Sequence, residues 1–400
     1  MAMRRIVVTG LGALTPIGNT VSEYWDGLIN GKSGANTITR FDASKFKTQF
    51  ACEVKDFKVT DYIDRKEARR MDPFCHYSVV TADEAMADSG LSEGDFRPER
   101  FGVIIGSGIG GISTFQEEVR NFYAGNGTPR FNPFFIPKMI IDIAAGHVSM
   151  KHGLKGPNYS CVSACATSSN CIADAFMLIR NGFADLMLAG GSEAAVTEAG
   201  IGGFNAMKAL STRNDDPSTA SRPFDKDREG FVLGEGGGTI LLEEYEHAKA
   251  RGAKIYAELT GIGLSADAHH MTAPHPEGDG AASVMTQCLE IAGIQPHEVD
   301  YINVHGTSTP LGDIAETKAI KRIFGDHAYK LNISSTKSMT GHLLGAAGAI
   351  EAIASILSIH NGIIPPTINH FTDDPDCDLN YTFHTPEKRD VNIALSNTFG

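Results

Sequence analysis

Positive charge is scarce in this sequence. Its 400 residues contain 35 Lys and Arg against 48 Asp and Glu, which gives a formal net charge of −13. General nucleic-acid binders and proteins of anionic membrane surfaces need a basic face, so this balance argues against both classes. The net charge does not exclude a local basic patch that binds an acidic partner.

Close cysteine pairs and long apolar runs are missing as well. The seven cysteines form neither a CxxC pair nor a repeated framework, which in a large chain is typical of a reducing compartment. No apolar stretch is long enough to cross a bilayer, and the run after Ile6 is broken at Gly10, Gly12 and Pro16, too early for a secretory signal. We therefore expect a cytoplasmic protein without membrane association.

The sequence does have the composition of a large folded chain. Hydrophobic residues make up 42% and charged residues 21%, which is unlike a disordered composition. By length alone, two or three domain-sized units are expected.

Three pairs of similar segments recur in the same order along the chain. Residues 6–12 and 257–263 each resemble a strand that ends in a glycine turn, and residues 101–108 and 299–307 each run from a strand into a glycine-containing turn. In the third pair, Ala/Gly-rich helices open at Cys165 and at His342. Each helix closes at Asn-Gly, the expected left-handed stop, before another strand.

This repeat predicts a duplicated α/β unit with a first half at residues 1–254 and a second half at 255–400. Residues 110–140 and 200–230 are expected to form insertions that cap the first half. The helices predicted over 166–180 and 343–359 are small and apolar on most faces, so both should be buried.

Cys165 is the candidate nucleophile because it lies in SACATSS, at the predicted start of a helix. A helix N-terminus lowers the pKa of a thiol, and its free N–H groups can hold an oxyanion. A buried, inert cysteine is the alternative interpretation of this motif alone. That packing role is expected for Cys161 and Cys171.

His305 and His342 are the candidate partners of Cys165. His305 stands where a hydrophobic strand ends in a turn, and His342 lies between a strand and a helix start. In the duplicated frame we take His342 as the counterpart of Cys165, so pseudo-symmetry would bring the two helix N-termini together. That arrangement would place three distant residues in one site.

Other interpretations of these motifs are weaker. A zinc site made of Cys165, His305 and His342 would lack the close ligand pairs usual for zinc, so no metal is expected. The glycines of GSGIGG match a dinucleotide loop only in part and lack the following acidic ribose ligand. Three further histidines are expected to be structural loop residues: His269, His270 and His275.

Taken together, the motifs resemble the β-ketoacyl-acyl-carrier-protein synthase II family over essentially the whole chain. The segments that carry the resemblance are VVTGLGALTPIG, GSGIGGI, NPFFIP, ACATSSN, SRPFDKDREGFVLGEG, HMTAPHPEG, NVHGTSTPLGD and STKSMTGHLLGAAGAIE. The resemblance implies a thiolase fold, with two five-stranded α/β halves in a five-layer α-β-α-β-α arrangement, and usually a homodimer.

The resemblance also implies a chemistry. Cys165 would accept an acyl chain from an acyl carrier protein, and His305 and His342 would assist decarboxylation of malonyl-carrier protein. The resulting enolate would attack the acyl-Cys165 thioester and lengthen the fatty acid by two carbons. No redox or metal cofactor is implied, because the substrates are carried on phosphopantetheine and loss of carbon dioxide drives the step.

Further residues take roles only from the family pattern. Lys337 and Glu351 would support the electrostatics of the site. The substrate-binding positions implied by the family are Thr307 and Thr309 for the phosphopantetheine arm, Ile109 and Phe135 for the acyl pocket, and Phe399. The family continues beyond Phe399-Gly400 with a phenylalanine that gates the pocket and supplies a second oxyanion N–H, and the sequence printed here ends before it.

The resemblance implies an acidic carrier protein, so a cluster of basic residues predicts where that partner docks. We expect docking at Lys66, Arg69 and Arg70, next to Arg65, and at two further positions that match the family, Arg130 and Lys208. A solvated charged face is the plainer alternative.

A ketosynthase of a polyketide or specialised fatty-acid pathway is the closest competing function. A chain-length-factor-like partner would lack the nucleophile that Cys165 supplies, and a biosynthetic thiolase would use a second cysteine instead of the two histidines.

Overall fold

The computed structural model describes residues 3–92 and 94–400. The strands are β1 (Ile6–Leu14), β2 (Asn36–Thr37), β3 (Phe50–Ala51), β4 (Phe101–Gly106), β5 (Asn158–Tyr159), β6 (Leu186–Glu193), β7 (Gly236–Glu244), β8 (Ala257–Leu259), β9 (Tyr301–Asn303), β10 (Asn332–Ser334), β11 (Ile363–Ile364), β12 (Glu387–Lys388) and β13 (Ala394–Ser396). The helices are α1 (Val21–Ile29), α2 (Arg65–Ala68), α3 (Pro73–Asp88), α4 (Ile112–Ala124), α5 (Phe135–Met139), α6 (Ile143–His152), α7 (Thr167–Arg180), α8 (Glu198–Ala206), α9 (Tyr245–Ala250), α10 (Asp279–Ala292), α11 (Pro310–Phe324), α12 (Lys337–Thr340) and α13 (Ala347–Asn361).

Two sheets organise the fold. The larger has the strand order β5-β4-β6-β7-β1-β8, and the smaller has the order β10-β9-β13. Strands β5, β4 and β6 are parallel, and so are β10, β9 and β13. The same three-strand arrangement therefore occurs in both halves, which agrees with the duplication read from the sequence.

The strand count of the two halves differs from the expected five each. Strand β8 pairs antiparallel with β1, with Ala257 opposite Val8 and Leu259 opposite Ile6, so it extends the sheet of the first half to six strands. Within the described residues, the second half keeps a ladder of three strands, and β11 and β12 pair with each other in a separate two-stranded sheet.

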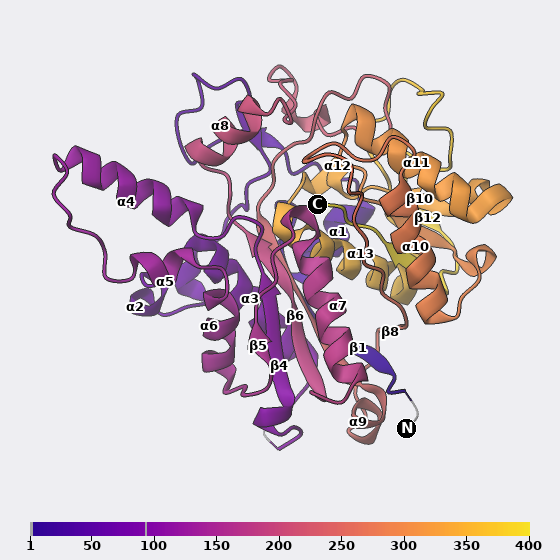
Figure 1. Cartoon of the computed structure of the whole chain (residues 1–400), viewed down its shortest axis with the longest axis horizontal. Helices are drawn as coiled ribbons and strands as arrows, with labels where there is room; N and C mark the ends of the chain where they lie inside the picture. The colour runs from indigo at the N-terminus through magenta and orange to yellow at the C-terminus, as the bar shows by residue number, and fades with distance from the viewer. Residues whose placement is uncertain (1–2, 93) are drawn as a thin grey trace.

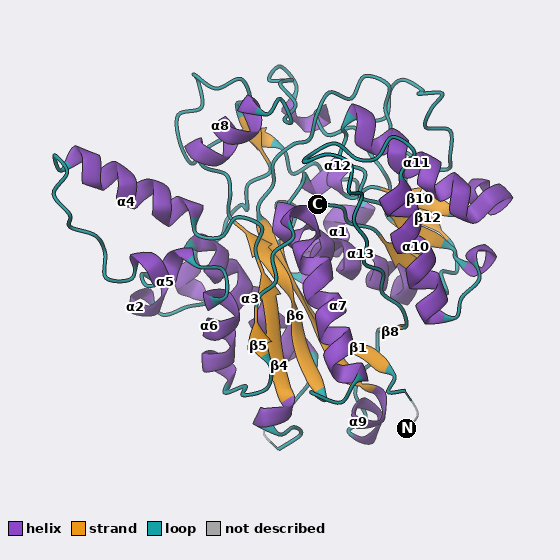
Figure 2. Ribbon diagram, in the orientation of Figure 1, coloured by secondary structure: helices purple, strands orange, loops and turns teal. Residues whose placement is uncertain are grey.

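Five layers alternate between helices and sheets (Figure 1). Helices α3 and α6 cover the outer face of the larger sheet, and α10 and α11 cover the smaller one, where Leu289 and Ile320 share a core with Ile302 and Ile333. Helices α7 and α13 lie between the two sheets, and Figure 2 draws these purple helices between the orange strands of the two halves. This is the layering of the thiolase fold.

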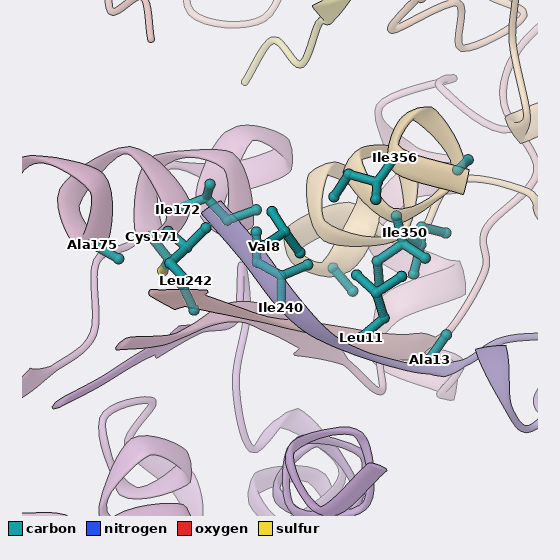
Figure 3. Close-up of a cluster of buried hydrophobic side chains, with 14 of the residues drawn as sticks. Val8, Leu11, Ala13, Cys171, Ile172, Ala175, Ile240, Leu242, Ile350 and Ile356 are labelled. Carbon is teal, nitrogen blue, oxygen red and sulfur yellow. The ribbon is translucent and has the colours of Figure 1, made fainter. Parts of the chain in front are cut away.

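The central layer is apolar because both of its faces pack against side chains of the strands. Figure 3 shows Leu11 and Ile240 of the larger sheet pointing toward Ile172 of α7 and Ile350 of α13. Fully burying one aliphatic side chain contributes about 1.5–3 kcal/mol, so this layer is a major source of stability. Residues Leu344–Asn361 are apolar and long enough to cross a membrane, but 78% of them are buried inside the protein, as expected for a core helix.

The first insertion leaves the body of the molecule. Helix α4 extends outward at the left of Figure 1, and its chain returns through α5 beside α2. The expected cap of residues 110–140 thus forms an arm built of two helices.

Candidate active site

The turn that carries Cys165 is strained. The chain passes from β5 through a 3₁₀ turn, Ala164–Ala166, before α7 begins at Thr167. Ala164 has a left-handed φ of 50°. A left-handed conformation costs an L-residue about 1–2 kcal/mol, so the surrounding contacts must hold it.

The second half repeats this turn. A 3₁₀ turn at Leu344–Ala346 precedes α13, and Leu344 has a φ of 47°. The helix starts (347 − 167) and the glycines that follow the two helices (362 − 182) are both 180 residues apart. Cys165 is therefore equivalent to Gly345, and the predicted equivalence with His342 is wrong by three residues. A 3₁₀ turn separates His342 from the true helix start, which the sequence pattern did not reveal.

The residue equivalent to Cys165 in the second half is a glycine, Gly345, for a steric reason. A Cβ there would lie 2.2 Å from the backbone N of Gly108 and 2.9 Å from Oε2 of Glu193. Only a glycine lets the loop after β4 pass so close to this turn. The two helix starts are tied together as well, because the N–H of Ala349 donates to Oγ of Ser168 at 2.9 Å.

Glu193, at the end of β6, was missed by the sequence analysis. Its fully buried carboxylate accepts hydrogen bonds from the N–H groups of Gly108 (2.8 Å), Ile109 (3.2 Å) and Gly345 (3.0 Å), and from the hydroxyl of Ser107. Burial raises the pKa of Glu193, and these hydrogen bonds oppose the rise. One carboxylate thus holds the predicted acyl-pocket loop against the turn equivalent to that of Cys165.

The structure brings His305 and His342 together. Their ring centroids are 5.3 Å apart, with the ring planes at 88°. The backbone of each is fixed separately: the N–H of His305 donates to Oε1 of Glu316 at 2.9 Å, and the N–H of His342 donates to the carbonyl of Val232 at 2.7 Å. Glu316 also accepts from the N–H of Gly306 at 2.9 Å.

Cys165 belongs to the same site through Phe231. Both pack in an apolar cluster with Leu344, and the Phe231 ring lies edge-on to His342 at 5.3 Å. On the other side, the ring of Phe399 lies 5.4 Å from His305. The nucleophile candidate, the two histidines and Phe399 therefore line one continuous region. Phe231 was not predicted, since nothing in its motif distinguishes it from a core aromatic.

Burial dominates the electrostatics of Cys165. Burial raises the pKa of this thiol to about 12, although the positive charge of Lys337 opposes the rise. The expectation of a pKa lowered by the helix N-terminus is wrong for the free enzyme, because removing a thiolate from water outweighs the favourable field.

Both histidines are held neutral. Burial lowers the pKa of His305 and of His342 well below the ordinary value, and the charge of Lys337 lowers both further. Among the described residues, Nδ1 of each ring is buried and has no hydrogen-bond partner. A neutral imidazole can accept a proton at one nitrogen and donate from the other.

Lys337 is compensated by Glu351 behind the site. The two side chains are each only 1% exposed and form an ion pair. Burial raises the pKa of Glu351 to about 7, and burial likewise raises the pKa of Glu316 to about 7. The predicted supporting pair is thus in place, with Glu316 as a second buried carboxyl group that the sequence did not single out.

The predicted substrate-binding residues differ in position. The hydroxyls of Thr307 and Thr309 lie 2.9 Å apart, just after His305. Ile109 is 37% exposed and lies within the loop that Glu193 holds. Phe135 lies in the arm, where its ring stacks on Phe131 at 5.6 Å and on Phe115 at 6.4 Å.

The basic residues separate into two groups. Lys66 and Arg69 are exposed on and after α2, next to Arg70, whose guanidinium lies 5.2 Å from the ring centroid of Phe134 at the start of α5. Arg130 is exposed in the arm that leads to α5. Lys208 follows α8, which Figure 1 draws well apart from α2.

A metal site is not formed by these side chains. Over residues 3–92 and 94–400, no group of three or more His, Cys, Asp or Glu is arranged to hold a metal ion.

Comparison with known proteins gives the family. The model of the β-ketoacyl synthase N-terminal domain matches residues 3–248, and the model of the C-terminal domain matches residues 256–371. The chain is 51% identical to 3-oxoacyl-[acyl-carrier-protein] synthase 2 of Synechocystis sp. over 99% of this chain and 95% of that protein. It is also 51% identical to the protein of the same name from Coxiella burnetii, over 100% of this chain and 96% of that one.

Solved structures agree with this result. The ishigamide ketosynthase/chain length factor superposes with a TM-score of 0.93 at 37% identity, covering 100% of this chain and 96% of that one. A ketosynthase of a type II PKS, in complex with its acyl-carrier protein, superposes with a TM-score of 0.91 at 37% identity, covering 98% and 95%. With both domain models matched and half of all residues identical to full-length relatives, the chain belongs to the β-ketoacyl synthase family.

Proposed function

We propose that this enzyme condenses malonyl-acyl carrier protein with an acyl chain held on Cys165 and so elongates fatty acids by two carbons. The observation that carries the proposal is that two neutral histidines lie ring to ring, and that Cys165 packs with Phe231, whose ring lies edge-on to His342. The names of the relatives that share half of its residues support the same reaction.

In the first half-reaction, the sulfur of Cys165 attacks the thioester carbonyl of the acyl donor. Since the pKa of Cys165 is about 12, the thiol is protonated before attack and loses its proton as the carbon–sulfur bond forms. The departing phosphopantetheine sulfur takes up a proton, so no net charge is left in the apolar surroundings. The unpartnered ring nitrogens of His305 and His342 offer a path for that proton.

In the second half-reaction, the malonyl group loses carbon dioxide. The electron pair of the broken carbon–carbon bond forms an enolate, whose oxygen accepts hydrogen bonds from the N–H groups of the two histidines. The enolate carbon then attacks the acyl-Cys165 carbonyl. The tetrahedral intermediate collapses to a β-ketoacyl product, and the departing Cys165 sulfur takes up a proton from solvent to restore the thiol.

Lys337 supports this step by keeping both imidazoles neutral, because its positive charge disfavours a second and third cation nearby. Glu351 compensates that charge from behind. Thr307 and Thr309 are proposed to bind the phosphopantetheine arm, and Ile109 and Phe399 to border the acyl chain. Phe135 is proposed as an acyl-pocket residue on the family pattern alone.

The proposed partner is an acyl carrier protein, bound near α2 by Lys66, Arg69 and Arg70, with Arg130 and Lys208 as further contacts. We propose a homodimer as the working form, supported by exposed apolar side chains on and beside α5: Phe134, Ile136 and Ile140. A cytoplasmic location fits the seven reduced cysteines. The reaction as written needs no cofactor.

A polyketide ketosynthase is the second candidate. The similarity to polyketide ketosynthase structures is 37% in identity, whereas the similarity to the synthase 2 proteins reaches 51% over nearly the full length, which favours fatty-acid elongation. The test is to supply acyl carrier protein loaded with a saturated acyl chain and malonyl-carrier protein labelled with carbon-13 in the two retained carbons. The account expects a β-ketoacyl product that carries both labels. Failure to form it with any chain length would refute the proposal.

A further inference from the structure

Two cysteines flank the nucleophile turn without a role in the proposed mechanism. Cys161 is partly exposed in the segment after β5, and Cys171 is fully buried on α7. Their sulfur atoms are 3.1 Å apart, and both are free thiols. In Figure 3 Cys171 is on the face of α7 that packs against the sheet, so its position is set by the core.

The end of β4 passes close to both cysteines. Where β4 ends, a Cβ on Gly106 would lie 3.0 Å from Sγ of Cys171 and 2.6 Å from the carbonyl oxygen of Cys161. Among the residues that the structure describes, the Cys161 sulfur makes one other hydrogen bond, a long contact of 3.9 Å to the carbonyl of Thr167. Each sulfur is therefore the nearest polar partner of the other.

The pKa of Cys161 is lowered and the pKa of Cys171 is raised, so Cys161 is the more acidic of the two thiols. The hydrogen bond from Cys171 lowers the pKa of Cys161 and raises that of Cys171, while burial and the carboxylate of Asp174 oppose the lowering at Cys161. Cys165, four residues further along, has its pKa raised to about 12. Since thiolates react with oxidants and thiols do not, Cys161 is placed to react before the nucleophile.

We propose that Cys161 and Cys171 are a redox modification site, in which a hydroperoxide converts the two thiols to a reversible disulfide that spans the Cys165 turn. The Cys161 sulfur attacks the outer oxygen of the peroxide, the O–O bond breaks, and an alcohol or water leaves while a sulfenic acid forms on Cys161. The sulfur of Cys171 then forms the S–S bond, the S–O bond breaks, and the hydroxyl group departs as water with the proton of Cys171. Two thiols are oxidised by two electrons and one peroxide is reduced.

The consequence concerns Cys165 directly. The sulfurs need to move about 1 Å closer to reach the bonding distance of a disulfide. The closed ring would run from Cys161 to Cys171 and fix both ends of the turn that carries the strained Ala164 and the nucleophile. Oxidising equivalents would be taken up beside Cys165 while its own thiol stays reduced.

The experiment uses the full chain and measures thiols, not condensation. The reduced protein is exposed to graded hydrogen peroxide, and N-ethylmaleimide then labels all remaining thiols in acidic denaturant. Cleavage after lysine and arginine gives one peptide, Gly156–Arg180, which contains Cys161, Cys165 and Cys171. We expect this peptide to pass from three maleimides to one, with Cys165 as the labelled residue, and dithiothreitol to restore three.

Variants separate this pair from other disulfides. In Cys165→Ala, the same peptide should pass from two maleimides to none, which cannot occur if Cys165 is a partner in the bond. Cys161→Ser should keep Cys165 and Cys171 labelled at the peroxide dose that closes the wild-type pair, and the control Cys288→Ala should behave like the wild type. Persistence of both labels in Cys165→Ala, or closure that requires Cys165, overturns the proposal without bearing on the proposed condensation.

Discussion

The rings of His305 and His342 meet edge to face, with centroids 5.3 Å apart and planes at 88°. Their backbones are held by different parts of the chain, His305 by Glu316 and His342 by the segment that follows Phe231. Two imidazoles so close to each other and to Lys337 cannot both be charged, and burial lowers the pKa of each. The pair is therefore prepared to donate hydrogen bonds to a developing negative charge.

The reactivity of Cys165 should depend strongly on pH. Because its pKa is raised to about 12, the thiolate fraction and the rate of alkylation by iodoacetamide should rise about tenfold per pH unit between about pH 7 and 10. Stopped reactions followed by peptide mass spectrometry measure this rate at Cys165 itself. A plateau below about pH 8 would show a thiolate paired with a charged histidine and contradict the account.

Glu316 should act as a positioning residue for His305. Glu316→Gln leaves one acceptor for two backbone N–H groups, and loss of such a buried bond costs about 1–3 kcal/mol. We expect decarboxylation of malonyl-carrier protein to slow about 10- to 100-fold, while acylation of Cys165 changes little. The control Glu290→Gln removes an exposed carboxylate from α10 and should change neither step. Equal losses in both steps would indicate a general structural effect instead.

The Lys337–Glu351 pair should be strongly coupled in stability. Lys337→Met leaves a buried carboxylate without its cation, which typically costs about 3–5 kcal/mol of unfolding free energy. The double variant Lys337→Met/Glu351→Gln should be destabilised by less than the sum of the two single changes. Chemical denaturation of the four proteins measures the coupling, and additive effects would argue against the ion pair.

The docking surface near α2 should depend on charge. Lys66→Glu and Arg69→Glu reverse two exposed cations, so the KM for acyl-acyl carrier protein should rise at low salt and approach the wild-type value at high salt. The control Lys330→Glu changes an exposed lysine of the second half. An unchanged KM in the double variant, or an equal rise in the control, would remove α2 from the docking surface.

The sequence predicted the elements of the fold better than their pairing. The two glycine-ended strands, the two buried helices and the duplicated order were all readable, because burial leaves an apolar pattern and αL stops leave glycines. The attachment of β8 to the sheet of the first half was not readable, since the hydrogen-bond partners of a short strand are decided by tertiary packing.

The site shows the same division. Cys165, His305 and His342 were singled out from their turns, and the structure brings the two histidines together and joins Cys165 to them through Phe231. The exact repeat register was not readable, because Gly345 is a glycine only to let Gly108 pass. Glu193 and Glu316 could not be recognised either, since a carboxylate that caps backbone N–H groups leaves no local motif. The pKa of Cys165 was expected to be lowered and is raised, because the sequence around a helix start does not show how far the thiol is buried.

The central claim is that Cys165 holds the acyl chain, and intact-protein mass spectrometry after incubation with acyl-acyl carrier protein tests it most directly. The account predicts that the wild-type chain and the control Cys161→Ala each gain the mass of one acyl group, and that Cys165→Ala gains none. Acylation that persists in Cys165→Ala would contradict the account.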